Sequence, residues 1–405
     1  MVIYSYTHVD LTNVEQNKVR DAFGRLRTSS PYTVFDCNFL TTRHNDRWTE
    51  RITGDGVVNY SSGSAWVELE SAANGSIIRQ TRRYLQYQPG KSFLIYITGC
   101  LSEFAPLTNQ TSRIGVYDDL DGFYFQFKDN VMSVVRRSNV TGTVIETVVD
   151  QSNWNINTFP DLDVTKRQIF IFEQEWLGVG AMTMFIVNED RLFQPVHRFN
   201  HVNNGTTPYT NRASLPVRYE IINTSTNPMK LVQICTSVNS EGGYNLAGKI
   251  FTYPLINSKS ISTETPVLAI RTAANRSRVG INPMSINALV ISSRAPIVYR
   301  IYKFNAPVSA TVLPGAVWNA SENIESCAEF DESATSVDFA AGTYELLFSD
   351  YFSDIIGVTY GDLNKYVITG SDVDGNPDIL VITMEKIDGG NAVDVALSLT
   401  YQEIE

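Results

Sequence analysis

The run Asp372-Val-Asp-Gly-Asn-Pro-Asp378 contains the acidic residues whose types and spacing best suit a metal ion. Asp372, Asp374 and Asp378, with Asn376 between them, could supply oxygen ligands to calcium around a glycine turn. The match to an EF-hand loop is partial, because no glutamate stands at the distance where the bidentate ligand belongs. An Asp-Gly-Asn-Pro run is also typical of an ordinary connection between strands. Calcium is therefore a candidate ligand, and a structural turn is the alternative.

The other groups of reactive side chains are incomplete. The acidic turn at 118–122 is a weaker calcium candidate of the same kind. His197 and His201 lie four residues apart, but no cysteine or glutamate completes a zinc set around them. Glu173 and Glu175 share one strand face without a cleft to hold a sugar between them. No GxSxG motif is present. We therefore predict that the chain is not an enzyme.

Aromatic and arginine side chains allow binding rather than catalysis. Exposed rings could stack on sugars while Asn, Asp and Arg supply hydrogen bonds, although packing in a sandwich core uses the same residues and is favoured. The pairs Arg82-Arg83 and Arg136-Arg137 could contact phosphate or form inter-subunit ion pairs, and the lack of a wider basic field favours the ion pairs. The aromatic candidates are Trp66, Tyr84, Tyr87, Trp154, Trp176 and Tyr209.

The elements that must position these residues are strands. From about 52 to 245, short β-branched and aromatic runs such as 92–98, 122–128 and 168–176 alternate with turn signals every 8–14 residues. The intervening helical patterns that parallel βαβ units need are missing. The last strand places Val393, Val395, Leu397, Leu399 and Tyr401 on one face. The sequence predicts an all-β protein, an antiparallel β-sandwich of the jelly-roll or lectin-like kind.

Three segments follow from this pattern. Residues 1–50 form an extended arm with a short helix at 11–27, residues 51–248 form the large β-sandwich, and residues 249–405 form a second, smaller β domain. The arm mixes basic and acidic residues, which suits a contact with a neighbouring subunit, and packing of the arm on its own domain is an equal alternative. A ring of identical copies, a trimer or another cyclic homo-oligomer, would bury edge strands that otherwise invite aggregation.

Composition and charge indicate which classes of partner the chain can bind. Hydrophobic residues make up 43% of the chain and charged residues only 19%, which is typical of β-rich assembly proteins. Residues 301–405 hold 18 acidic residues against three lysines, a net charge of −15, so we expect no nucleic-acid partner. No apolar run is long enough to span a membrane, and no signal peptide is visible. The four cysteines lie far apart, which favours free thiols.

Several stretches, taken together and in order, resemble a family of virion structural proteins from tailed phages and environmental viruses. They are Asp21-Ala-Phe-Gly-Arg-Leu-Arg followed by Pro31-Tyr-Thr-Val-Phe-Asp, then Trp176-Leu-Gly-Val-Gly, Leu215-Pro-Val-Arg-Tyr-Glu-Ile and Asp374-Gly-Asn-Pro-Asp-Ile-Leu. The linker at 250–265 and the segment 305–340 depart from that likeness.

The resemblance implies a structural component of a virus particle, made in the host cytoplasm and then carried in the virion. It would be capsid-associated, as a minor capsid or decoration protein, or belong to the tail, with other capsid or tail proteins as partners. The candidate interface residues in the arm are Phe23, Arg25, Arg27, Tyr32 and Phe35. The alternative is a carbohydrate-binding fibre or adhesin protein that recognises host surface glycans.

Overall fold

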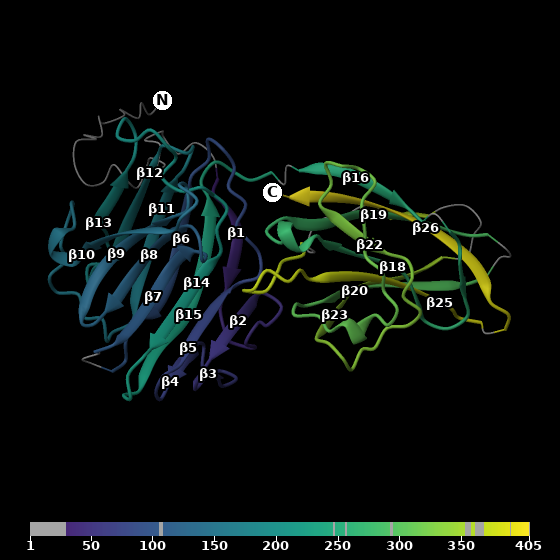
Figure 1. Cartoon of the computed structure of the whole chain (residues 1–405), viewed down its shortest axis with the longest axis horizontal. Helices are drawn as coiled ribbons and strands as arrows, with labels where there is room; N and C mark the ends of the chain where they lie inside the picture. Colours follow the sequence, from purple (N-terminus) through teal and green to yellow (C-terminus); the bar gives the residue numbers. More distant parts are fainter. Residues whose placement is uncertain are drawn as a thin grey trace, which may run out of the picture. The chain divides into compact units, whose positions relative to one another are not determined.

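The computed structural model describes residues 30–404 except 105–107, 246–247, 256, 292–294, 353–357, 361–367 and 389. Across these residues the chain is built from antiparallel strands, with three short 3-10 helices at Gln151–Asn153, Ala274–Arg276 and Ala310–Val312 (Figure 1). The prediction of an all-β fold is confirmed. The predicted helix at 11–27 lies outside the described residues. No helix in the described part of the chain could cross a membrane.

The chain divides into two compact units. Unit 1 comprises the described residues of Met1–Arg43, Thr53–Ile77 and Tyr87–Asn245, and unit 2 comprises those of His44–Ile52, Ile78–Gln86 and Leu246–Glu405. The predicted division at 248/249 assumed that each domain is continuous in sequence. In the structure two short segments from the N-terminal half belong to unit 2, because their side chains pair within it. Buried Arg82, for example, forms an ion pair with Asp378, and Arg51 forms one with Asp374.

The first sheet of unit 1 has eight strands. Its order is β13 (Phe193–Asn200), β12 (Ala181–Val187), β11 (Gln168–Glu175), β6 (Phe93–Cys100), β15 (Met229–Ser240), β4 (Val67–Ser71) and β3 (Gly56–Tyr60), with β1 (Tyr32–Cys37) also paired to β15. Residues 32–37, which the sequence assigned to an arm, therefore form a strand in the described structure. Phe35 is buried there, whereas Tyr32 is 52% exposed and stacks on Tyr244.

The second sheet has seven strands, and the last two in its order, β5 and β2, consist mostly of residues that belong to unit 2. Its order is β10 (Ile145–Asp150), β9 (Val131–Ser138), β8 (Gly122–Lys128), β7 (Gln110–Tyr117), β14 (Val217–Asn223), β5 (Ser76–Thr81) and β2 (Trp48–Thr53). Aromatic side chains of β8 pack between the two sheets. Phe125 faces the first sheet, where its ring centroid lies 4.8 Å from that of Phe170 and 5.5 Å from that of Phe172. Tyr124, one residue earlier, points to the opposite face, as the two-residue period of a strand requires.

Unit 2 also has two sheets. One has the order β16 (Lys249–Pro254), β26 (Val393–Ile404), β19 (Gly280–Val290) and β24 (Val358–Tyr360), with β17 (Lys259–Ile261) also on β26. The other has the order β21 (Asn319–Ala320), β22 (Ala328–Asp331), β18 (Thr265–Thr272), β25 (Ile379–Lys386), β20 (Ile297–Phe304) and β23 (Tyr344–Phe352). The alternating residues Val393 to Tyr401 of β26 are buried in the core of this unit, as the pattern predicts.

Candidate functional site

The four predicted calcium ligands do not converge on one point. Asp372 closes its own turn: one carboxylate oxygen accepts from the backbone N–H groups of Asp374 and Asn376, at 2.9 and 2.8 Å, and the other accepts from the Asn376 amide at 2.7 Å. Asp374 points outward, is 59% exposed and pairs with Arg51 at 3.1 Å. This geometry is that of the structural turn given as the alternative.

Asp378, the fourth residue of that set, is buried in a separate network. Its carboxylate accepts from the backbone N–H groups of Ala306 and Gly370, both at 2.9 Å. The same carboxylate lies 3.3 Å from the Arg82 guanidinium and 3.5 Å from the Lys303 ammonium. Within the described ranges, no three acidic, histidine or cysteine side chains are arranged to hold a metal ion.

The remaining predicted groups also have structural roles. Asp118 accepts from the backbone N–H groups of Leu120 and Asp121, at 2.7 and 2.9 Å, and so holds the acidic turn. His197 is buried, and its Nδ1 accepts from the backbone N–H of Asn155 at 3.3 Å. His201 binds the carbonyl of Thr207 at 2.5 Å. The two histidines therefore serve different loops and do not form a shared zinc site.

The predicted aromatic residues separate into three groups by exposure. Tyr87, Trp154 and Tyr209 are buried and belong to the core, as the favoured alternative held. Trp176 and Tyr84 are half-buried. Trp66 immediately precedes β4, is 40% exposed and lies beside an accessible group of polar side chains.

We define the carboxylate–aromatic strip as Trp66, Glu68, Glu70, Glu103, Phe104 and Lys230. Val67 and Leu69 of β4 point into the core of unit 1, so the alternate residues Glu68 and Glu70 point outward. Lys230 stands opposite Glu70 on the neighbouring strand β15. The loop after β6 adds Glu103, whose backbone N–H donates to the carbonyl of Lys230 at 3.2 Å. Three segments distant in sequence thus meet on one face of the first sheet.

The centre of the strip is an ammonium surrounded by carboxylates. Lys230 Nζ lies 2.6 Å from Glu70, 3.4 Å from Glu68 and 3.5 Å from Glu103. Partial burial opposes the charge on Lys230, but the hydrogen bond to Glu70 and the three negative charges outweigh it and raise the pKa of the lysine. Arg167 binds Glu103 from the far side at 2.5 Å. The strip is therefore a preorganised row of hydrogen-bonding groups with a small excess of negative charge.

An aromatic ring is attached at each end of this row. The indole N–H of Trp66 donates to Glu68 at 3.1 Å, which fixes the ring beside the carboxylates. The ring of Phe104 lies 6.0 Å from Lys230 Nζ and is 41% exposed. Asn59 of β3 adds an amide that donates to Glu70 at 2.7 Å. Exposed rings flanking polar side chains can bind a ligand that has both apolar faces and hydroxyl groups.

A second charged cluster, which sequence reasoning missed, lies on the outer face of the second sheet. Tyr117 donates to Glu220 at 2.9 Å, and Tyr124 donates to Glu146 at 2.7 Å. Arg137 pairs with Glu146 at 2.7 Å and lies over both tyrosine rings. Burial raises the pKa of each tyrosine above its ordinary value. Both rings are completely buried, so this cluster is part of the packed structure rather than a surface for a ligand.

The same cluster revises one arginine prediction. Arg136 and Arg137 were expected to form inter-subunit ion pairs, yet both bind partners on the adjacent strand β10 of their own chain. Arg137 binds Glu146, and Arg136 donates to Thr147 at 3.2 Å. Two-residue alternation could have placed Tyr117 and Tyr124 on outward faces, but it could not show which arginines would stack on them.

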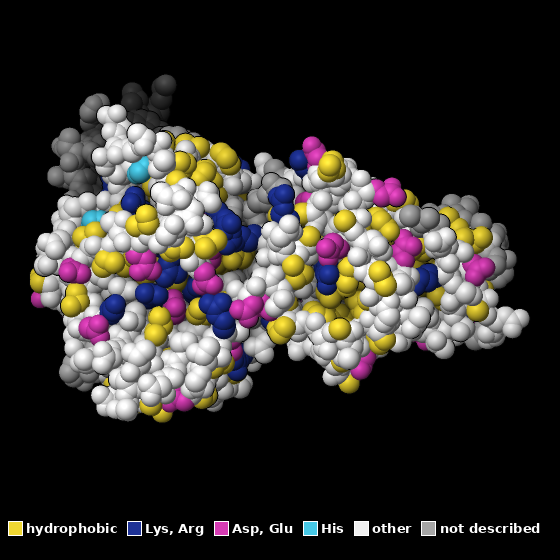
Figure 2. Space-filling model, in the orientation of Figure 1, with side chains coloured by type: hydrophobic (Ala, Val, Ile, Leu, Met, Phe, Trp, Pro, Cys, Tyr) yellow, Lys and Arg dark blue, Asp and Glu magenta, His cyan; other side chains and the backbone are white. Residues whose placement is uncertain are grey.

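On the face shown in Figure 2, acidic and basic side chains are interspersed among uncharged ones.

No family model matches the sequence, and no curated protein does either. Among solved structures, the chain is similar to an endo-1,3-β-glucanase from Streptomyces sioyaensis, with 9% identity over 52% of this chain and 97% of that one, at a TM-score of 0.39. It is also similar to lectin I-B4 from Griffonia simplicifolia, with 10% identity over 51% and 99% of the two chains and a TM-score of 0.31. A carbohydrate esterase from the Shiga toxin-encoding bacteriophage phi24B shows 12% identity over 52% and 99%, also at 0.31.

These similar proteins are lectin-like or act on carbohydrates, and at such identities the likeness concerns the fold alone. Two of the three are enzymes, so our prediction that the chain is not an enzyme is contradicted and is withdrawn.

Proposed function

We propose that the chain is a carbohydrate-binding protein of the fibre or adhesin kind, with the carboxylate–aromatic strip as its binding surface. The observation that carries the proposal is the pairing of two exposed rings, Trp66 and Phe104, with a fixed row of hydrogen-bonding groups between them. Sugar rings present apolar C–H faces and hydroxyl edges. Aromatic side chains can cover the faces, while carboxylates and amides accept and donate at the edges.

The strip is suited to neutral sugars. Three carboxylates face Lys230 and Arg167, so the local charge disfavours sulfated or uronic residues and leaves acceptors for sugar hydroxyls. The side chains are held by strands β4 and β15 and by one another. Little conformational entropy is therefore lost when a ligand binds, which favours affinity from a shallow surface.

A glycan array probed with the purified full chain tests the proposal. We expect binding to neutral glycans, and we expect Trp66→Ala to weaken it at least about tenfold, equivalent to about 1.4 kcal/mol. Phe104→Ala should weaken it as well. Phe193→Ala is the matched control, because Phe193 is 45% exposed on unit 1 but lies outside the strip. Unchanged glycan binding in both strip variants, or a wild-type chain that binds no glycan, would overturn the proposal.

The second candidate function is a structural role in a phage particle. It is supported by the sequence stretches that, in the same order along the chain, resemble virion structural proteins. Tyr32, one of the predicted interface residues, is half-exposed at the start of β1, whereas Phe23, Arg25 and Arg27 lie outside the described residues. Deleting residues 1–29 spares β1 and its pairing with β15. We expect this truncation to lose incorporation into particles while it keeps glycan binding. Normal incorporation would count against the particle role.

A further inference from the structure

We infer that the chain binds a second copy of itself through the edge strand β10, in an antiparallel pair that joins the second sheets of the two copies. Among the described residues, β10 stands at one end of its sheet and is hydrogen-bonded to β9 alone (Figure 1). Alternate residues of an edge strand direct their backbone N–H and C=O groups away from the sheet, where another strand can bind them. The carbonyl of Val149 accepts from the indole of Trp154 at 3.2 Å, and a second lone pair remains on that oxygen.

The side chains of β10 are those of a strand that has a neighbour on each side. Four of its six residues are β-branched, a type that is enriched in strands because it packs well against cross-strand partners. Ile145 is 53% exposed and Val148 is 49% exposed, and Val144, which immediately precedes the strand, is 39% exposed. Ile145 and Val148 point to opposite faces of the sheet, since side chains alternate along a strand. A paired strand would cover apolar surface on both faces.

Other edge strands in the described structure carry features that prevent such pairing. β13 contains Pro195, which has no N–H to donate, and a register shift interrupts its pairing with β12. β16 begins with an exposed lysine, Lys249, and ends with Pro254. β10 has neither proline nor lysine, and all six of its residues pair with β9 without a register shift. Its Glu146 is held on the outer face by Arg137, so that carboxylate does not block the edge.

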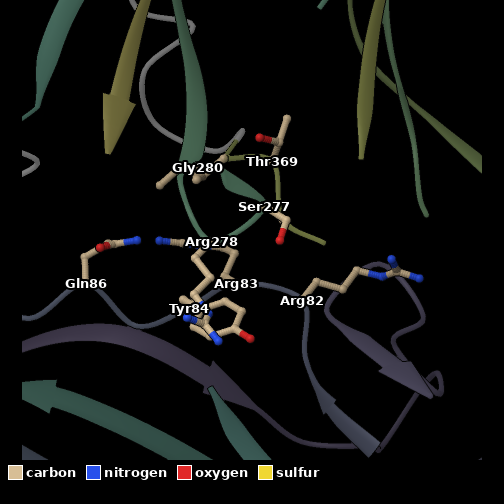
Figure 3. A pocket seen from close by; sticks show the side chains of 10 residues that line it. Arg82, Arg83, Tyr84, Gln86, Ser277, Arg278, Gly280 and Thr369 are labelled. Atoms are coloured by element: carbon tan, nitrogen blue, oxygen red, sulfur yellow. The ribbon is translucent and has the colours of Figure 1, made fainter. Parts of the chain in front are cut away.

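The opposite edge of the same sheet is used within the chain. The side chain of Arg82, which follows β5, extends away from Tyr84 and Arg278 (Figure 3). Its guanidinium donates to the carbonyl of Asn45, in the segment that leads into β2, and to that of Ala306, at 2.7 and 2.8 Å. The β2 edge is therefore tied to other segments of unit 2, whereas β10 lies at the far end of the strand order.

The charges on β10 select one self-complementary register. Directly opposite residues of an antiparallel pair point to the same face, so a two-fold axis through one residue keeps the outer faces of both sheets on one side. An axis through Thr147 or through Val148 pairs the five strand residues centred on it with the same five of the other copy. The axis through Val148 places Glu146 opposite Asp150 of the other copy, which brings like charges together. The axis through Thr147 places Glu146 opposite Val148, and this is the register that we infer.

Sedimentation velocity of the full chain over a hundredfold range of concentration tests the inference. A pair of six-residue strands is a small interface, so the dimer should be weak and depend on concentration. Val148→Glu should weaken it at least tenfold, because the new carboxylate faces Glu146 of the other copy. Val148→Lys faces the same carboxylate with an ammonium and should associate at least tenfold more tightly than Val148→Glu. Ile250→Glu is the matched control, because Ile250 is 57% exposed on the edge strand β16 and should not affect association.

Cysteine cross-linking tests the register itself. In a Cys235→Ser background, which removes the exposed native thiol, Thr147→Cys should give a disulfide-linked dimer on mild oxidation, because the two thiols face each other at the axis. Ile145→Cys is the control: Ile145 is more exposed than the half-buried Thr147, but it lies opposite Val149 of the other copy. Cross-linking at position 145 that equals or exceeds that at position 147 would overturn the inference.

The remaining outcomes also decide the matter. A wild type that is monomeric at every concentration overturns the inference, as does a dimer that Val148→Glu leaves intact. Deleting residues 1–29 should leave association unchanged, and a dimer that forms only after this deletion would identify the chain's own N-terminal residues as the occupant of β10. The inference does not depend on the proposed function, because β10 shares no residue with the carboxylate–aromatic strip. A monomeric chain that binds glycans would therefore overturn this inference alone.

Discussion

Replacing Asp378 by asparagine should destabilise unit 2 by about 3–5 kcal/mol, the usual cost of removing one partner from a buried ion pair. The Asp378 carboxylate is completely buried. It lies 3.3 Å from Arg82 and 3.5 Å from Lys303, whose side chains are themselves only 8% and 10% exposed. Asparagine keeps the shape but loses the charge, so two buried cations remain uncompensated. Its NH₂ group would also face the backbone N–H of Ala306 or Gly370, where an acceptor is required.

The expected change in Tm follows from this free energy and from the size of unit 2. For a unit of roughly 150–250 residues, each kcal/mol lowers the Tm by about 2–4 °C, so Asp378→Asn should lower it by about 6–20 °C. Differential scanning calorimetry is the suitable assay, because it measures the Tm of wild type and variants directly. Asp374→Asn is the matched control from the same turn. Its carboxylate is 59% exposed and pairs with Arg51, and an exposed ion pair contributes at most about 1 kcal/mol.

The calcium hypothesis makes a different forecast for the same two variants. If Asp372, Asp374 and Asp378 shared an ion, calcium would raise the Tm of the wild type by ligand linkage, and both variants would lose that increase. Equal destabilisation by Asp374→Asn and Asp378→Asn, together with a calcium-dependent Tm, would refute our assignment of Asp378 to a buried ion network. A calcium-independent Tm with a large effect of Asp378→Asn alone would support it.

Two further predictions concern pH. Burial lowers the pKa of His197 from 6.5 to about 4. The stability that comes from keeping this imidazole neutral is therefore complete above about pH 6.5 and is lost as the pH falls toward 4. Urea unfolding should show this acid-dependent loss of stability, and the loss should be smaller in His197→Gln. Burial opposes the charge of Glu146, but hydrogen bonds from Tyr124 and Arg137 lower its pKa, so its contribution is present above about pH 4.5 and is lost in more acidic solution. Tyr124→Phe should cost about 0.5–1.5 kcal/mol at neutral pH and should make unfolding less acid-sensitive, and an unchanged acid transition would contradict that role.

The strands and their inward faces follow from local sequence. The alternation at 393–401 predicts which side chains enter a core, because the two-residue period of a strand holds whatever the strand pairs with. Strand Gly122–Lys128 is buried on both faces, which its own alternation could not show. The turn at 372–378 is equally local, since Asp372 binds backbone groups two and four residues further along the chain. For this reason an all-β sandwich with short connections was predictable from the residues alone.

The carboxylate–aromatic strip depends on a pairing between distant segments, which no local pattern contains. Glu70 meets Lys230 because β4 pairs with β15 in one register, and a shift of one residue would turn Lys230 to the other face. Arg278 lies over Tyr84 although nearly half the chain separates them. Arg82 pairs with Asp378 although 296 positions separate the two residues, and no local pattern could have indicated that buried ion pair.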